Sequence, residues 1–275
     1  MENQRMNAET EYLVRPEGRI AYQSEGDGPL VVLVPGMGDL RSAYRFLTPA
    51  LVSSGYRVVA VDLRGHGDSD VTFSKYGDAS TAEDLAALLK ELGPAVLIGN
   101  SMAAGAAVIV AAEHPGLVNG LVLIGPFVRQ AASDSVMTRV AFRILMARPW
   151  AAAVWNAYLP KLYAGRLPAD FDKYRARVAA SMRRPGYARA FSLTTRTDHL
   201  QAANSLGRVH TPALVVMGEK DPDFKNPRDE AAWIAKALTA RTVMIPEAGH
   251  YPQSQQPELV AEAISAFLAE VSDLA

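Results

Sequence analysis

The sequence contains no cysteine among its 275 residues. This absence excludes disulfide bonds, thiolate catalysis and metal sites with cysteine ligands. Long hydrophobic runs are also missing, because no apolar stretch reaches the roughly 18 residues that a membrane-spanning helix needs. The first residues, MENQRMNAETEY, are polar and lack the apolar core of a secretory signal. We therefore expect a cytoplasmic protein without a membrane partner.

A surplus of charge is missing as well. The chain has 28 Lys and Arg against 29 Asp and Glu, a formal net charge of -1. This balance does not favour a nucleic-acid partner. No set of His, Asp and Glu has the spacing of metal ligands, and no glycine-rich nucleotide loop follows a strand. The sequence thus predicts a small-molecule substrate, no metal and no cofactor, and it leaves the oligomeric state open.

Short apolar runs, rich in valine, recur along the chain with helical segments between them. Runs that are apolar at every position are typical of parallel strands buried on both faces. Six of them lie at residues 30–34, 56–62, 95–98, 120–124, 213–217 and 241–245, and two further strand-like segments precede them at 11–15 and 19–23. We therefore predict an α/β fold with a mostly parallel, twisted, eight-stranded sheet and helices on both faces.

Two of the helical segments have recognisable patterns. Ser80 and Glu83 form a plausible capping box at the start of a helix that ends at Gly93. The last helix, near residues 257–271, has apolar residues at helical spacing. Ligands of such sheets bind at the carboxyl ends of the strands, so the residues that do chemistry are expected just after the apolar runs.

One stretch interrupts the alternation of strands and helices. Residues 127–206 contain no clear buried strand, hold ten aromatic residues, and carry 13 Lys and Arg against four Asp and Glu. We predict a helical cap here, inserted over the carboxyl edge of a core formed by residues 1–126 and 207–275. Trp155 and Tyr158 are its candidate substrate-pocket residues. Its basic side chains either meet an anionic substrate group or form the solvated faces of surface helices.

Ser101 is the candidate nucleophile. It stands in a Gly-Asn-Ser-Met-Ala turn between the apolar run 95–98 and an alanine-rich helical segment. A sharp strand-to-helix turn strains the backbone of its middle residue and exposes that side chain above the sheet. The residues two positions away must be small, as Gly99 and Ala103 are. The alternative role of Ser101 is to cap the helix.

A serine needs a base, and His250 follows the last predicted strand. Asp221 follows the preceding strand and is the candidate for orienting the imidazole, with Asp223 as the alternative. The simpler interpretation of Asp221 is a structural one, as a turn residue before Pro222. His66 also follows a strand. The remaining histidines lie at a helix end, in the predicted cap and at the start of a strand: His114, His199 and His210.

The order Ser, Asp, His resembles that of the α/β-hydrolase superfamily. The resemblance extends from about Gly18 to Leu268 and rests on several motifs. These are Val-Pro-Gly-Met-Gly at 34–38, Asp-Leu-Arg-Gly-His-Gly-Asp-Ser at 62–69, the nucleophile turn at 99–103, Gly-Glu-Lys-Asp at 218–221 and Gly-His-Tyr-Pro at 249–252. Together they are highly specific for the fold.

The resemblance implies an oxyanion hole made of two backbone amides, those of Met37 and Met102. Two residues depart from the family pattern. Pro35 stands where many relatives have histidine, which leaves open how the loop is braced. Ala103 replaces the last glycine of the G-x-S-x-G pattern.

The resemblance also implies a serine hydrolase that cleaves a small carboxylic ester or a related acyl substrate. The alternatives are a C–C bond hydrolase of ring-fission dienoic acids, a perhydrolase of the haloperoxidase type, a lactonase, an amidase, or a non-catalytic ligand receptor. Gly-Asn-Ser-Met resembles the C–C hydrolases, whereas Pro35 and Ala103 do not. Dehalogenases and epoxide hydrolases carry aspartate at the position of Ser101, which argues against those reactions.

Overall fold

The computed structural model describes residues 9–130 and 136–273, so residues 1–8 and 274–275 of the predicted core and 131–135 of the predicted cap lie outside the described part. Its centre is one eight-stranded sheet in the order β1-β2-β4-β3-β5-β6-β7-β8. The strands are β1 Thr10–Arg15, β2 Gly18–Glu25, β3 Leu30–Val34, β4 Arg57–Val61, β5 Ala95–Asn100, β6 Val118–Ile124, β7 Ala213–Gly218 and β8 Arg241–Ile245. Only β2 pairs antiparallel with its neighbours, so the predicted mostly parallel sheet is confirmed.

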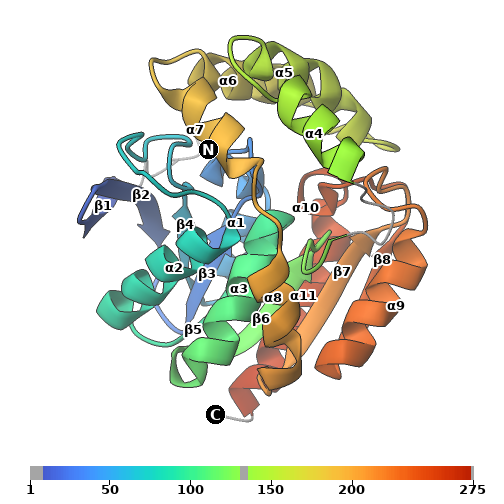
Figure 1. The fold of residues 1–275 in the computed structure, drawn as a ribbon. Coiled ribbons are helices and arrows are strands. Elements are labelled where there is room, and N and C mark those ends of the chain that lie inside the picture. Colours follow the sequence, from blue (N-terminus) through green and yellow to red (C-terminus); the bar gives the residue numbers. More distant parts are fainter. Residues whose placement is uncertain (1–8, 131–135, 274–275) are drawn as a thin grey trace, which may run out of the picture.

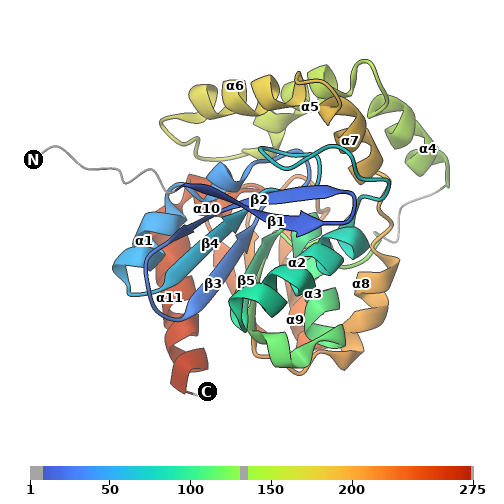
Figure 2. The same ribbon diagram turned by 90° about the vertical axis from the view of Figure 1, so that its left-hand side faces the viewer.

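Helices cover both faces of the sheet (Figures 1 and 2). One face packs against α2 (Asp78–Leu92), α3 (Met102–Glu113) and α9 (Pro227–Leu238), and the other packs against α1 (Leu47–Ser53) and α11 (Pro257–Asp273). The valines of each strand alternate between these two apolar clusters, as Val31 and Val32 do. Burial on both faces explains why the strand sequences are apolar throughout.

Four helices form a layer above the carboxyl edge of the sheet (Figures 1 and 2). They are α4 (Val136–Leu145), α5 (Ala151–Leu162), α6 (Phe171–Met182) and α7 (Tyr187–Thr194). The next helix, α8 (Leu200–Ser205), packs instead beside α3. The last short helix, α10 (Pro252–Gln255), follows His250. None of the helices described is long and apolar enough to cross a membrane.

Helix α2 begins earlier than its capping box predicts. It starts at Asp78, with Gly77 as the N-cap, so Ser80 lies inside the first turn. The Asp78 carboxylate accepts hydrogen bonds from the amide of Ala79 and the hydroxyl of Thr197. Thr197 is distant in the sequence, and this tertiary contact outweighs the local capping signal.

Candidate active site

Ser101 occupies the turn between β5 and α3 with a φ of 60°. This left-handed conformation is strained for a residue with a side chain. The Ser101 amide donates a hydrogen bond of 2.9 Å to the carbonyl of Ile124 on β6, which holds the turn against the sheet. A Cβ on Gly99 would lie 2.6 Å from the carbonyl oxygen of Ala103, so only glycine fits at that position. The turn therefore has the geometry that the sequence predicts for a nucleophile.

The loop after β3 lies against Ser101. A Cβ on Gly36 would stand 2.8 Å from the Cβ of Ser101, so the closeness of this approach requires glycine. Met37 follows in the same loop, and Met102 is the first residue of α3. The amide of a first helical residue has no acceptor within its helix. Both predicted oxyanion amides thus belong to segments that border Ser101.

His250 and Asp221 are in direct contact. The distance from His250 Nδ1 to Asp221 Oδ2 is 2.7 Å, and both side chains are buried. Burial alone lowers the pKa of His250, but the charge and hydrogen bond of Asp221, with the charge of Asp223, raise it to about 9. The pair therefore favours an imidazole whose Nδ1 proton faces Asp221 and whose other nitrogen is free for proton transfer.

Asp223 lies close to the same imidazole, but farther away than Asp221. Its Oδ2 is 3.8 Å from His250 Nδ1, its amide donates to Asp221, and its Oδ1 accepts a 2.7 Å hydrogen bond from the hydroxyl of Tyr158. Burial raises the pKa of Asp223, opposed by the charge of His250. Asp221, Asp223 and His250 are also the described residues whose atoms are close enough to hold a metal ion. Their hydrogen bonds to one another and to Tyr158 account for this grouping without a metal.

Asn100 connects the turn at Ser101 to the loop that carries His250, a role that sequence reasoning missed. Its side-chain amide donates to the carbonyls of Ile124 (3.0 Å) and His250 (3.2 Å). Phe127 makes a second connection, because its amide donates to the Ser101 carbonyl and its ring centroid lies 5.8 Å from that of His250. The position of Asn100 directly before the nucleophile was the available signal.

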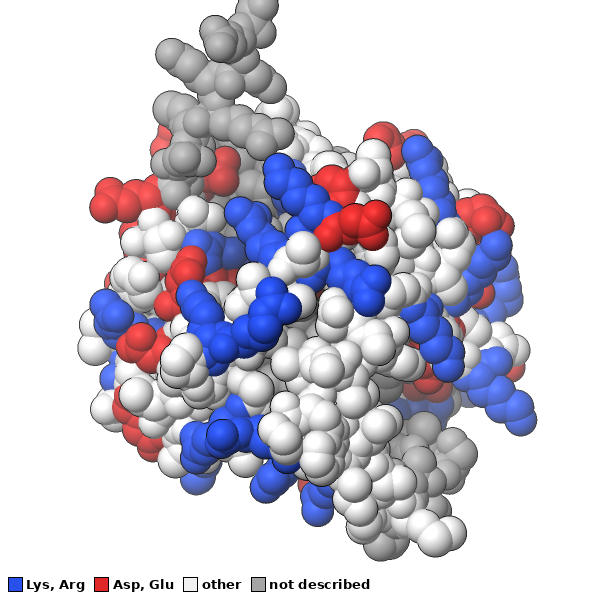
Figure 3. All heavy atoms as spheres, turned by 90° about the horizontal axis from the view of Figure 1, so that it is seen from above, with Lys and Arg blue, Asp and Glu red and all other residues white. Residues whose placement is uncertain are grey.

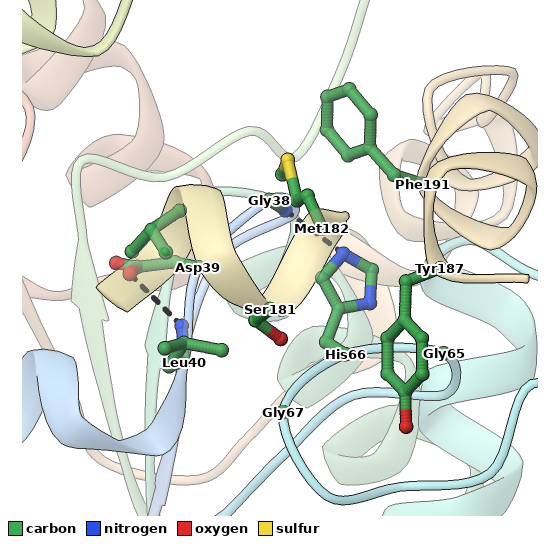
Figure 4. A pocket seen from close by; sticks show the side chains of 11 residues that line it. Gly38, Asp39, Leu40, Gly65, His66, Gly67, Ser181, Met182, Tyr187 and Phe191 are labelled. Carbon is green, nitrogen blue, oxygen red and sulfur yellow. Dashed lines mark hydrogen bonds between the residues drawn. The ribbon is translucent and has the colours of Figure 1, made fainter. Parts of the chain in front are cut away.

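His66 braces the loop that carries Met37. The Gly38 amide donates a 2.9 Å hydrogen bond to His66 Nε2, and His66 Nδ1 lies 2.8 Å from the carbonyl oxygen of Arg64. Figure 4 shows this contact at the edge of a pocket that is also lined by Met182 and Phe191. Ser101 does not line this pocket. Both nitrogens of His66 are engaged, so His66 is unsuited to be the base, although it follows a strand.

Helix α5 holds the loops of the site together from above. The Trp155 indole donates a 2.9 Å hydrogen bond to the carbonyl of Gly38, and Tyr158 binds Asp223. At the end of the helix, the Leu162 carbonyl accepts a 2.8 Å hydrogen bond from the His250 amide. Trp155 and Tyr158 therefore contact the loops that surround the predicted site, and their role in a substrate pocket stays a prediction.

Comparisons with known proteins agree with this architecture. Residues 31–263 match the model of the Alpha/beta hydrolase family. The 2-(acetamidomethylene)succinate hydrolase of Mesorhizobium japonicum is 30% identical over 91% of this chain and 92% of its own length. The 2-hydroxy-6-oxononadienedioate/2-hydroxy-6-oxononatrienedioate hydrolase of Comamonas testosteroni is 26% identical, with 91% of each chain covered. A solved thermophilic esterase from Thermogutta terrifontis has a TM-score of 0.82 and 26% identity, covering 96% of this chain and 99% of that one.

The environment of His66 predicts a specific effect of pH on stability. Burial lowers the pKa of His66 to about 4, so the unfolded chain binds more protons at this residue below pH 6.5. Its contribution to stability is therefore lost as the pH falls through this range. We expect the difference in unfolding free energy between the wild type and His66→Gln to shrink by about 2 kcal/mol from pH 7.5 to about pH 5.

Urea unfolding at the two pH values measures this difference. The control is His210→Gln, because His210 is exposed. This variant measures how far the same substitution at an exposed position alters the unfolding free energy at each pH. A His66→Gln difference that is the same at both pH values would contradict a buried, neutral His66.

Proposed function

We propose a specific reaction on one premise: the chain belongs to the alpha/beta hydrolase family and is a hydrolase. The proposed reaction is the cleavage of a small carboxylic ester or a related acyl substrate through an acyl-enzyme. Ser101 is the nucleophile, His250 the base and Asp221 the residue that orients the base. The observation that carries this proposal is the strained turn at Ser101, with Gly36 on one side and the hydrogen-bonded pair His250–Asp221 in the neighbouring loop.

The first half of the reaction forms the acyl-enzyme. Ser101 Oγ attacks the carbonyl carbon while His250 Nε2 takes the hydroxyl proton. The carbonyl oxygen becomes an oxyanion, for which the amides of Met37 and Met102 are the proposed donors. When the tetrahedral intermediate collapses, the bond to the alcohol breaks and His250 returns the proton to the leaving oxygen. Asp221 stabilises the imidazolium throughout, from 2.7 Å.

The second half repeats the same steps with water. His250 takes a proton from a water molecule, whose oxygen attacks the acyl carbon of the ester on Ser101. The collapse of this second intermediate releases the carboxylic acid, and the proton goes from His250 back to Ser101 Oγ. No further cofactor is needed to balance these steps.

The position of α4–α7 supports the proposed cap of residues 127–206, although α8 at the end of this range packs beside α3. Ser101 has only 6% of its surface exposed and His250 only 2%, and α5 contacts the loops around both of them. A cap in this position excludes water and shapes the acyl pocket. Trp155 and Tyr158 are the proposed pocket residues, because their polar atoms bind the loops of the site and their rings lie next to each other.

The ester assignment is supported by the likeness to the Thermogutta esterase over almost the whole chain. An acyl substrate of another kind is named for the Mesorhizobium relative, whose substrate contains an acetamido group and a succinate. The shared feature of an ester and such an amide is a carbonyl carbon that a serine can attack. The nature of the leaving group is therefore the property to test.

A second candidate is the hydrolysis of a C–C bond in a dienoic acid. The Comamonas relative is named for substrates of this class. The Gly-Asn-Ser-Met turn of residues 99–102 and the positive charge of residues 127–206 also favour it, since such substrates are anionic. Pro35 and Ala103 remain departures from that group.

A panel of substrates with one variant separates these functions. We expect the wild type to hydrolyse p-nitrophenyl esters of short acyl chains faster than a ring-fission dienoic acid. Ser101→Ala should lower kcat by several orders of magnitude and leave the circular dichroism spectrum unchanged, because it removes only the attacking oxygen. Faster turnover of the dienoic acid would favour the C–C hydrolase, and full ester hydrolysis by Ser101→Ala would refute the nucleophile.

The two aspartates should differ in their effects on the rate and its pH dependence. Asp221→Asn should lower kcat by about 10⁴-fold, since it disturbs the tautomer of His250. Asp223→Asn keeps an acceptor for Tyr158 but removes a negative charge 3.8 Å from the imidazole. In the wild type, the apparent pKa of the kcat/KM profile should lie above 6.5, because Asp221 and Asp223 raise the pKa of His250. Asp223→Asn should retain most of kcat and lower this apparent pKa.

Steady-state rates of ester hydrolysis over a range of pH measure both effects. Since neutral imidazole is the active base, a lower pKa moves the rising limb of the profile to lower pH. A larger loss of kcat in Asp223→Asn than in Asp221→Asn would transfer the orienting role to Asp223.

A further inference from the structure

Exposed apolar side chains are concentrated on helix α4 and the turn that follows it. Twelve large hydrophobic residues are exposed in the described part of the chain, and half of them lie between positions 137 and 150. These six residues are Met137, Val140, Phe142, Ile144, Leu145 and Trp150. Exposed apolar residues are usually scattered singly, so a cluster of this kind indicates an interaction surface.

The packing of α4 leaves this surface without a partner. Helices α5, α6 and α7 pack on one another, whereas α4 has no extensive contact with any other described element. Figures 1 and 2 show α4 at one end of the layer of upper helices. Met146, just after the helix, is buried in the core, and the Trp150 indole donates to the Ile144 carbonyl. The end of α4 is thus anchored while its apolar residues face outward.

The helix is amphipathic and its surroundings are basic. One face of the helix is apolar, because four apolar residues at helical spacing share it and Arg143 is displaced from it. These four are Met137, Val140, Ile144 and Leu145. Between residues 135 and 169 the sequence contains five Lys and Arg and no Asp or Glu. Arg143 and Arg148 are exposed and have no carboxylate partner within the described ranges. Figure 3, which shows the molecule from above, shows an area of uncharged surface with Lys and Arg on the same face of the molecule.

We propose that α4 docks on an anionic lipid surface, with its apolar face in the lipid and with Arg143 and the nearby Arg148 at the headgroups. A basic amphipathic helix of this kind lies in the plane of a membrane interface. Its ten residues span about 15 Å, too short to cross a bilayer. The net charge of -1 conceals this property, because the +9 of residues 127–206 is balanced elsewhere in the chain. The proposal goes beyond the proposed reaction and does not depend on it.

The charge of this stretch favours lipid over a second copy of the chain as the occupant. A symmetric contact through α4 would bring the same surface of two copies together. Arg143 and Arg148 would then approach the arginines of the partner, and no acidic residue from 135 to 169 is available to neutralise them. Anionic headgroups supply that neutralisation.

The test is co-sedimentation of the full chain with vesicles of phosphatidylcholine alone or mixed equally with phosphatidylglycerol. We expect binding to the mixed vesicles, weakened by added salt. Ile144→Asp should lower the affinity at least about tenfold, because it places a charge on the apolar face. Leu200→Asp is the matched control, since Leu200 is 60% exposed and Ile144 61%. It should bind like the wild type.

A second pair of variants tests the arginines. Replacing both Arg143 and Arg148 by Gln should lower binding to the mixed vesicles by about fivefold for each charge. Replacing the exposed Lys90 and Lys236 by Gln changes the net charge equally, away from α4, and should have little effect. Circular dichroism and urea unfolding verify that each variant is folded.

Three results would overturn the proposal. The first is a wild-type chain that does not bind the mixed vesicles. The second is equal binding by Ile144→Asp and Leu200→Asp. The third is a dimer, seen by analytical ultracentrifugation, that Ile144→Asp dissociates in a chain without vesicle binding, because a second copy would then occupy α4.

Discussion

The turn at Ser101 is the constraint around which the rest of the molecule is arranged. Its φ of 60° persists because β5 and α3 are fixed in the core on either side and Ile124 holds its amide. The turn also demands small neighbours, which is why Gly36 and Gly99 cannot be replaced without steric conflict. Strain of this kind costs about 1–3 kcal/mol, and the packed sheet offsets it.

The helical layer above the sheet also contacts the site. Helix α5 forms hydrogen bonds with the loop after β3 through Trp155, with Asp223 through Tyr158, and with the loop that carries His250 through the Leu162 carbonyl. These three loops follow different strands, and their contacts with α5 fix the distances between them. A change in the position of α5 therefore alters geometry at the site as well as access to it.

The sequence predicts those parts of the structure that depend on local patterns. Valine-rich runs revealed the parallel strands, because burial on both faces leaves no polar positions. The small residues around Ser101 revealed the turn. The earlier start of α2, the contact of His66 with Gly38 and the Tyr158–Asp223 hydrogen bond depend on residues far apart in the sequence. No local signal reports such contacts. The exposed face of α4 is also hidden from the sequence, because an amphipathic pattern does not tell which helices stay without a partner.

The role of Ser101 as an activated nucleophile can be tested by labelling with a fluorophosphonate, with the modified residue located by mass spectrometry. An activated serine reacts with such a reagent, whereas an ordinary hydroxyl does not. We expect one adduct on Ser101 that is lost in Ser101→Ala and strongly slowed in His250→Ala. Ester hydrolysis by a protein that remains unlabelled at Ser101, or an adduct on a different residue, would contradict it.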